Sequence, residues 1–416
     1  MVFIKTLCFK ILKTDVSIFR LKMLFCLSYG IISIIERSEI MEVKNIQKKV
    51  MAEIDLNALE ENFKKVKGPV CCVVKADAYG HGAVEVSKFL EKIGASYLAV
   101  SNIEEAIEIR NGGVKMPIVI LGYTPTDCAK ELATYDIDQC VYSLEFAKAL
   151  NENAKANNVK IKMHIKIDTG MGRIGFQYHD KHNELKDALD ACKLSNLIPH
   201  GIFMHFAKSD EGINDYTKNQ YNNFIGAIKY LEDNGIKFKI HHCANSGAIL
   251  DYQDYHLDMV RAGVILYGVN PSPIEHHFKY VLTLKSRVSH VKTVFKGDSV
   301  SYNGLFVAER DTKIATIPVG YADGFCRESM GTHVMINGKK ATVIGRVCMD
   351  QMMVIAGDDV KVGDEVIIYG EGITVDDVAK YNKTSPYKVL CDIGRRVPRV
   401  YKYNGKIIAV RDDLVK

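Results

Sequence analysis

The sequence predicts an α/β protein of two domains: an N-terminal (β/α)8 TIM-like barrel and a C-terminal, mainly antiparallel β domain. Two patterns in the 416 residues carry this prediction. Between about residues 50 and 280, short apolar runs alternate with stretches of helical apolar spacing, as in a barrel. After residue 280 the apolar runs follow one another without long helices, as in antiparallel sheets. A doubly wound open sheet is the alternative for the first half, because periodicity alone does not exclude it.

Eight apolar runs of the first half have the length of strands. They are 70–74, 96–100, 118–121, 139–142, 160–167, 201–205, 239–242 and 259–262. Helical spacing is clearest between some of these runs, at 103–111, 144–151 and 219–234. In a barrel the carboxyl ends of all strands meet on one face, so the residues that end these runs are expected to gather there.

The second half contains strand-like runs at 281–295, 313–318, 333–336, 341–344 and 365–369. Asn337-Gly338 and Asn404-Gly405 are strong hairpin signals, because both positions of each pair tolerate positive φ. We therefore predict a barrel domain at 48–280 and a β domain at 281–416, with residues 1–47 as an extension outside the fold.

The first 40 residues differ from the rest of the chain. Basic residues precede an apolar run from Met23 to Ile35, which is shorter than the roughly 20 residues of a membrane-spanning helix. The run has the length of a signal-peptide core, but no small-x-small cleavage site follows it. We expect a non-native or mis-assigned start, with Met41 as the real one, and a signal peptide is the alternative.

Composition narrows the classes of partner. The net charge is +5, from 55 basic and 50 acidic residues. No basic block interleaved with aromatic residues occurs, so no nucleic-acid partner is expected, and no membrane partner either. The eleven cysteines show no C-x-x-C spacing. This pattern favours reduced thiols and a cytoplasmic location over a disulfide or metal framework.

One lysine stands at the end of an apolar, β-rich run. Residues 71–82 read CCVVKADAYGHG, in which Lys75 ends the run, and Tyr79 and His81 follow in a turn with glycines. Because desolvating an ammonium without a partner is costly, such a lysine has a depressed pKa or is captured by a carbonyl cofactor. Pyridoxal 5'-phosphate (PLP) is a cofactor of this kind. A surface lysine at a strand end is the alternative.

Polar residues also end other predicted strands: Lys166, Asp168, His205, Asn245, Ser246 and Arg261. Each alone has a structural explanation, such as a turn, a core histidine or a salt bridge. Together they predict a barrel mouth rich in groups that bind phosphate and carboxylate.

Ten blocks of the sequence occur in the order and spacing typical of one enzyme family. They are AEIDLNAL (52–59), VVKADAYGHG (73–82), IKIDTGMGRIG (165–175), MHFAKSDE (204–211), HCANSGAIL (242–250), MVRAGVILYG (259–268), VSYNG (300–304), IPVGYADGF (317–325), GRVCMDQ (345–351) and RRVPRVY (395–401). From about residue 48 to 416 the chain thus resembles the alanine racemases. The resemblance implies a PLP enzyme that interconverts L- and D-alanine as a homodimer with shared active sites, and supplies D-alanine for peptidoglycan.

The resemblance also implies roles for single residues. Lys75 forms the Schiff base with PLP and is one of two acid/base groups. Tyr302, supplied by the other subunit, is the second group and acts on the opposite face. Two unlike bases remove a proton on one face and deliver one on the other without moving the substrate.

The other implied roles concern binding. Arg261 faces the pyridine nitrogen, where a group that only donates leaves the nitrogen unprotonated, and His205 braces Arg261. The remaining implied PLP-binding residues are Tyr79, Asn245, Ser246, Gly263, Val264 and Tyr387. For the substrate, Arg173 binds the carboxylate, a carbamylated Lys166 orients Arg173, and Met349 of the other subunit closes the pocket.

Two positions depart from the common family pattern, Asn303 and Cys326, and neither removes a catalytic atom. Three other functions are compatible with parts of the pattern. A PLP decarboxylase of similar architecture is expected to have an acidic partner for the ring nitrogen, unlike Arg261. A non-catalytic PLP-handling barrel is expected to lack Tyr302 and the β domain. A racemase of broader substrate range is the hardest alternative to distinguish from an alanine racemase, because the two differ in the size of the side-chain pocket.

Overall fold

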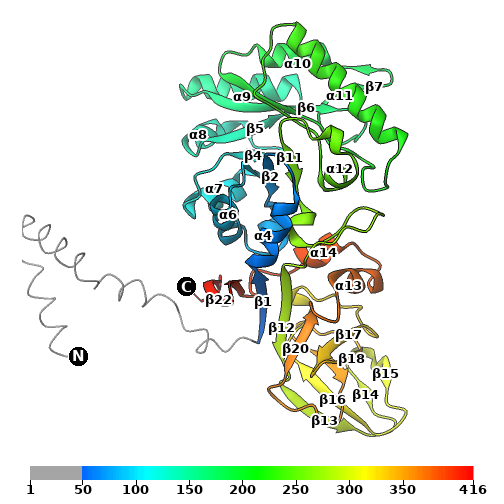
Figure 1. The fold of residues 1–416 in the computed structure, drawn as a ribbon. Helices are drawn as coiled ribbons and strands as arrows, with labels where there is room; N and C mark the ends of the chain where they lie inside the picture. The colour runs from blue at the N-terminus through cyan, green and yellow to red at the C-terminus, as the bar shows by residue number, and fades with distance from the viewer. Residues whose placement is uncertain (1–48, 416) are drawn as a thin grey trace, which may run out of the picture. The chain divides into compact units, whose positions relative to one another are not determined.

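The barrel predicted for the first half is formed by eight parallel strands, seen in the upper part of Figure 1. The structure is a computed structural model that describes residues 49–415, so the expectations for residues 1–47 lie outside the described residues. The barrel strands are β2 (Val70–Val73), β3 (Tyr97–Val100), β4 (Ile118–Ile120), β5 (Ile137–Val141), β6 (Ile161–Asp168), β9 (Leu197–Phe203), β10 (Ile240–His242) and β11 (Val260–Ala262).

The order of these strands rules out the doubly wound sheet. From β2 to β10 each strand pairs with the next one in the chain, and β11 returns to pair with β2. Two backbone hydrogen bonds then join the segments of β10 and β11, from Arg261 to Ala244 (2.9 Å) and from Asp258 to His241 (3.1 Å). The strands therefore close into a barrel, with their carboxyl ends on one face.

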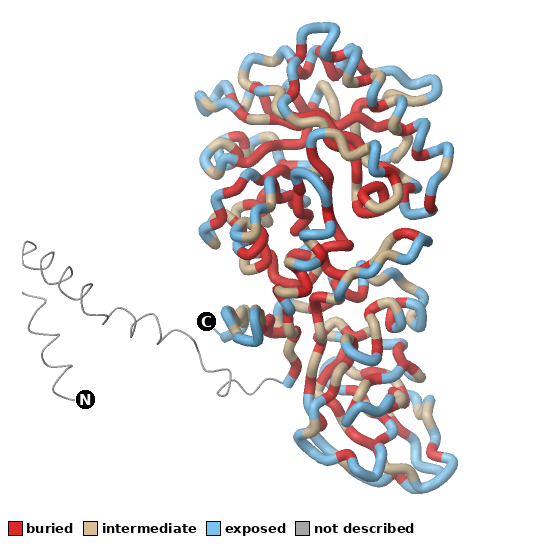
Figure 2. The backbone as a smooth tube through the Cα atoms, in the orientation of Figure 1, coloured by how far each residue is buried: buried red, intermediate tan, exposed pale blue. Residues whose placement is uncertain are grey.

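The helices between the strands follow the apolar spacing of the sequence. They are α4 (Leu56–Lys65), α6 (Ala83–Lys92), α7 (Ile103–Asn111), α8 (Ala129–Thr134), α9 (Leu144–Ala156), α10 (Leu185–Cys192), α11 (Asp215–Asp233) and α12 (Ser246–Asp251). Asn102, Ser143 and Asn214 cap α7, α9 and α11 by accepting backbone N–H groups. Figure 2 shows buried backbone along the strands and exposed backbone on the outer helices and loops.

The second domain is built on a ten-stranded sheet. Its strands are β1 (Val50–Asp55), β12 (Leu282–Arg287), β13 (His290–Val294), β16 (Thr312–Ile317), β17 (His333–Ile336), β18 (Lys339–Ile344), β19 (Met352–Ile355), β20 (Glu365–Tyr369), β21 (Arg399–Tyr403) and β22 (Lys406–Arg411). All pairings in this sheet are antiparallel except that of β1 with β21. The prediction of a mainly antiparallel domain is confirmed.

Both hairpin predictions in this domain are correct. Asn337 and Gly338 have φ of 51° and 72° between β17 and β18, and Asn404 and Gly405 have φ of 50° and 73° between β21 and β22. The predicted run at 281–295 differs from the structure, because it divides into β12 and β13 at residues 288–289.

The first described strand crosses the domain limit drawn from the sequence. β1 precedes the barrel in the chain, yet it pairs antiparallel with β12 and parallel with β21 in the sheet of the second domain. Its burial alternates along the strand, as expected when one face packs on a core. Two helices of the second domain, α13 (Val375–Tyr381) and α14 (Pro386–Cys391), complete the fold, and α14 contacts the turn that carries Lys75. Among the helices of residues 49–415, none has the length and apolarity to cross a membrane.

Candidate active site

A cavity of about 450 Å³ lies at the carboxyl ends of the barrel strands. Its volume is in the range of small-molecule and cofactor sites. Nine of the residues predicted for the site line it: Lys75, Tyr79, His205, Asn245, Ser246, Arg261, Gly263, Val264 and Tyr387. Eight of them follow or end barrel strands, and Tyr387 comes from α14 of the second domain.

Lys75 opens a turn with an unusual backbone. The turn is labelled α5 (Lys75–Tyr79), but Ala76, Asp77, Ala78 and Tyr79 have φ between 52° and 55° and form a left-handed turn. For L-residues that conformation costs roughly 1–2 kcal/mol per residue. Four consecutive left-handed residues without a glycine therefore require strong contacts from the surrounding structure.

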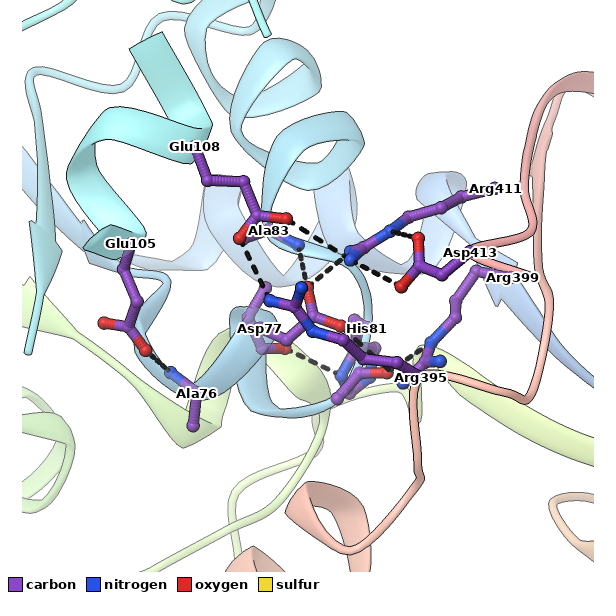
Figure 3. A network of polar contacts seen from close by, with 12 residues as sticks. Ala76, Asp77, His81, Ala83, Glu105, Glu108, Arg395, Arg399, Arg411 and Asp413 are labelled. Atoms are coloured by element: carbon purple, nitrogen blue, oxygen red, sulfur yellow. Dashed lines mark hydrogen bonds and ion pairs between the residues drawn. The ribbon is translucent and has the colours of Figure 1, made fainter. Parts of the chain in front are cut away.

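These contacts come mostly from the end of the chain, as Figure 3 shows. The Asp77 carboxylate accepts hydrogen bonds from the Ala83 backbone N–H (2.8 Å) and from Arg411 (2.5 Å). Arg399 donates to the Gly80 carbonyl (3.1 Å), and the Tyr401 hydroxyl donates to the His81 carbonyl (3.0 Å). Strands β21 and β22 of the second domain thus hold the turn that carries Lys75 and Tyr79.

The barrel side of the turn is held by Glu105 and by the ring of His81. Glu105 accepts the Ala76 backbone N–H at 2.7 Å (Figure 3). Nδ1 of His81 lies 3.0 and 2.9 Å from the carbonyls of Ala78 and Tyr79. Burial lowers the pKa of His81 to about 4, so its ring is neutral and serves the turn rather than proton transfer.

Lys75 is a cation without an ion-pair partner in the described part of the chain, and its side chain is partly buried. Burial is the main cause that lowers its pKa, and the positive charge of Arg173 lowers it further. Both effects increase the neutral fraction of the amine at a given pH. A neutral amine is the form that attacks a carbonyl and accepts a proton.

Arg261 is buried, with 3% of its surface exposed. Nη1 donates to the His242 carbonyl (3.0 Å), and Nη2 donates to the carbonyls of Met204 (2.8 Å) and Cys243 (3.0 Å). Nη2 also lies 3.4 Å from Nδ1 of His205. None of these partners is a carboxylate.

The other end of the cavity gathers neutral donors around Gly263. The Gly263 backbone N–H donates to the Ser246 hydroxyl at 3.0 Å. A Cβ at Gly263 would lie 3.0 Å from the Tyr79 hydroxyl and 3.5 Å from the Ser246 hydroxyl. Glycine therefore keeps open the space on which these hydroxyls converge. Tyr387 lies beside them, with its ring centroid 6.4 Å from that of Tyr79.

Lys166 and Arg173 do not line the cavity, but their charges affect it. Lys166 is buried, and its nitrogen lies 4.7 Å from the centre of the Phe203 ring. Burial, followed by the charge of Arg261, lowers the pKa of Lys166 to about 7. Arg173 ends a loop held by Asp168, whose carboxylate accepts four backbone N–H groups of residues 170–173. Asp168 therefore shapes the loop.

Tyr302 and Met349 lie on the second domain and do not line the cavity of their own chain. Their exposed fractions are 61% and 54%. Their loops are neighbours, because the Ser301 hydroxyl donates to the Arg346 carbonyl (2.6 Å) and lies 3.7 Å from Sγ of Cys348. The two residues therefore lie on neighbouring exposed loops. Tyr321 adjoins them, because its backbone N–H donates to the Cys348 carbonyl (3.1 Å).

Several cavity residues were missed from the sequence. Leu121 follows β4 and fits the strand-end rule, but only polar residues were selected by that rule. Asp210 stands in a quoted block without an assigned role, and Cys391 ends a helix that the sequence did not predict. The arginines that hold the left-handed turn were missed as well, because no short-range signal links residues 77 and 411.

The donors of the cavity fit PLP. The group needs an amine for its carbonyl, a contact for its ring nitrogen and several donors for its phosphate. Lys75, Arg261 and the cluster of hydroxyl and backbone N–H donors around Gly263 offer these three functions within one cavity.

Comparisons with known proteins agree with this chemistry. Residues 54–271 match the family described as alanine racemase, N-terminal domain, and residues 281–401 match alanine racemase, C-terminal domain. An alanine racemase of Clostridium perfringens is 45% identical over 379 residues, which cover 87% of this chain and 98% of that protein.

Two solved structures have the same fold. Alanine racemase of Clostridium difficile 630 has a TM-score of 0.85 at 42% identity, over 89% of this chain and all of the other. Alanine racemase of Bacillus anthracis with bound L-Ala-P has a TM-score of 0.84 at 34% identity, over 89% and 99% of the two chains. The chain therefore belongs to the alanine racemase family, whose members are PLP-dependent isomerases.

Proposed function

We propose that this protein interconverts L- and D-alanine, with PLP held in the cavity at the barrel mouth. The observation that carries the proposal is that Lys75 and a buried arginine, Arg261, line the same cavity. Bound PLP supplies a carbonyl that captures amines and an electron sink that acidifies the hydrogen on Cα. The roles below concern what the residues of the chain contribute.

Lys75 holds the cofactor and then acts as a base. Its lowered pKa favours the neutral amine, which can take the proton from Cα of one enantiomer. In the reverse reaction the same group delivers a proton to the same face of Cα. The left-handed turn gives the amine a fixed origin at the end of β2. A base fixed in this way serves one face of the substrate only.

Arg261 holds the ring nitrogen as a donor. A guanidinium does not give up its proton under ordinary conditions, so it leaves the ring nitrogen unprotonated and limits how far charge spreads into the ring. This favours rapid return of the proton to Cα over side reactions. A carboxylate at this point would support a decarboxylase, and the described contacts of Arg261 include none.

Tyr302 serves the opposite face in the cavity of a second copy of the chain. The support is that Tyr302 and Met349 are exposed on one surface of the second domain and absent from the lining of their own cavity. A homodimer that presents this surface to the partner's cavity would complete both sites. Each site then contains one amine and one phenol as unlike bases.

Arg173 binds the substrate carboxylate, and Lys166 is carbamylated. The support for the carbamate is a buried lysine whose pKa is lowered to about 7 and which has no acid partner among residues 49–415. The neutral amine adds CO2 and releases one proton, so that a neutral side chain becomes an anion. That anion would offset the charges of Arg173 and Arg261.

D-alanine formed in this way would supply peptidoglycan synthesis in the cytoplasm. The nine cysteines of the described residues are free thiols, which supports a reducing compartment.

The test uses purified protein with PLP and single L-amino acids, followed by chiral analysis of the products. D-alanine should form fastest, and Lys75→Ala should abolish the reaction. Borohydride reduction followed by peptide mapping should place the pyridoxyl group on Lys75. Faster racemisation of serine or another amino acid than of alanine would favour the broader racemase, and a pyridoxyl group on another lysine would overturn the role of Lys75.

A further inference from the structure

A chain of buried side chains runs through the barrel interior behind Arg261. Nη1 of Arg261 lies 3.1 Å from Nδ1 of His242, and Nε2 of His242 lies 2.9 Å from Nδ1 of His164. Nε2 of His164 then lies 3.1 Å from Oδ2 of Asp138. All four side chains are at most 3% exposed. The chain connects the cavity to the opposite end of the barrel, where Asp138 stands near the start of β5.

The two ends of this chain fix the direction of every hydrogen bond in it. Arg261 can only donate, so Nδ1 of His242 accepts and its proton is on Nε2. His242 therefore donates to Nδ1 of His164, whose proton is also on Nε2 and is donated to the carboxylate. Burial, followed by the charge of Arg261, lowers the pKa of His242 well below its usual range. A neutral His242 is required for this arrangement.

The barrel makes room for the chain. A Cβ on Gly201 of β9 would lie 2.3 Å from Nδ1 of His164, so only glycine leaves space for this ring. The pairing of β6 with β9 shifts register between Met163 and His164, so that Gly201 is the residue opposite His164. The ring of Phe203 stacks on His242 with centroids 4.9 Å apart. Imidazole orientations are thus fixed by packing as well as by hydrogen bonds.

Asp138 is the buried counter-charge at the end of the chain. Its Oδ2 accepts the Tyr97 hydroxyl at 2.6 Å, and its Oδ1 lies 3.3 Å from Nζ of Lys162. Burial alone would raise the pKa of Asp138, but the contacts with His164, Tyr97 and Lys162 lower it. The carboxylate is therefore charged and accepts from the chain throughout the neutral range.

We propose that Asp138 is a positioning residue for Arg261 and acts through His164 and His242. His242 holds Nη1 of Arg261, and the carbonyls of Met204 and Cys243 hold Nη2. The Nε–H is then the donor left for the ring nitrogen of bound PLP. Asp138 makes this arrangement directional, because it is the terminal acceptor. The inference rests on the proposed function for the role of Arg261. The proton positions follow from the hydrogen bonds between Arg261, His242, His164 and Asp138 alone.

The first test needs no cofactor. Neutron diffraction of the protein prepared without PLP should place the ring protons of His164 and His242 on Nε2. A proton on Nδ1 of either ring would overturn the proposed direction and with it the role of Asp138.

The second test compares three variants of the PLP-loaded protein. Asp138→Asn removes the terminal charge, and Gly201→Ala displaces the His164 ring without removing a polar atom. Asp136→Asn is the matched control, because Asp136 also pairs with Lys162 (2.8 Å) but is not part of the chain. Replacing a charge-assisted hydrogen bond by a neutral one is expected to lower kcat about tenfold.

Asp138→Asn and Gly201→Ala should therefore lower kcat with the KM for alanine within about twofold, and should shift the visible absorption maximum of bound PLP. Asp136→Asn should change neither. Unchanged kcat and absorption in both Asp138→Asn and Gly201→Ala would overturn the proposal. If Asp138→Asn fails to fold, a folded Gly201→Ala decides the point. If the unmodified protein racemises no alanine, the proposed function fails. The proton positions and the absorption maxima still test the role of Asp138.

Discussion

Arg411 is predicted to control how tightly the protein binds PLP, although it lies on the last strand of the chain. Removing its side chain in Arg411→Ala deprives the Asp77 carboxylate of its 2.5 Å partner. Asp77 in turn holds the left-handed turn between Lys75 and Tyr79, two residues of the cavity.

The magnitude follows from strain and burial. Four left-handed residues at roughly 1–2 kcal/mol each cost about 4–8 kcal/mol, which the contacts around the turn must offset. The side chains of Arg411 and Asp77 are each 14% exposed, and breaking a buried pair costs about 3–5 kcal/mol. We take about 3 kcal/mol here, because the pair retains some contact with water. The loss removes a large part of the stabilisation that offsets the strain, so the turn should relax in the absence of cofactor.

Restoring the turn would then reduce the free energy of PLP binding. About 3 kcal/mol corresponds to a dissociation constant roughly 100-fold larger. The assay is a spectrophotometric titration of the apoprotein with PLP. Arg411→Lys should restore part of the affinity, because it keeps one charged donor.

The control is Arg395→Ala. Arg395 is mostly exposed and pairs with Glu108 at 3.2 Å, as Arg411 does at 3.3 Å, but it does not contact Asp77. Its replacement should change the PLP dissociation constant less than about twofold. If Arg411→Ala binds PLP as tightly as the unmodified protein, the turn holds its shape without the C-terminal strand and the reasoning is refuted.

Three further predictions concern the reaction. Tyr302→Ala should abolish solvent-deuterium exchange into L-alanine and leave some exchange from D-alanine through Lys75; equal loss from both enantiomers with PLP bound would contradict two bases. Mixing inactive Lys75→Ala and Tyr302→Phe chains should restore partial activity, since one site of each heterodimer regains both bases, and no recovery after verified subunit exchange would argue against shared sites. With 13C-labelled CO2, NMR should detect a carbamate that is absent in Lys166→Gln and fades as pH falls through about 7, because the neutral amine needed for the carbamate is lost as Lys166 is protonated; absence of the signal at pH 8 would count against carbamylation.

Local patterns predicted most of the barrel and its mouth. Each of the eight apolar runs overlaps a barrel strand, because buried parallel strands are continuous apolar segments. Lys75, His205, Ser246 and Arg261 reach the cavity because they follow or end those strands. These relations are encoded within a few residues of chain.

Relations between distant segments could not be read in this way. β1 was grouped with the barrel because it precedes it in the chain, whereas its partners β12 and β21 lie more than 200 residues away. The left-handed turn was invisible, since KADAY contains no glycine and its conformation depends on Arg399 and Arg411. The hydrogen-bonded side chains behind Arg261 were missed, because each resembles an ordinary core residue until the distances are known. These residues are His164, His242 and Asp138.

The position of β1 has a consequence for biosynthesis. The strand leaves the ribosome before the barrel, but its parallel partner β21 follows about 340 residues later. At roughly 5–20 residues per second, β1 waits about 20 to 70 seconds with an unpaired edge. An edge of this kind is a site for pairing with another chain. A nascent chain released before residue 399 would therefore expose an aggregation-prone strand. It would also lack the arginines that shape the turn after Lys75, so incomplete products would aggregate and would not hold the cofactor.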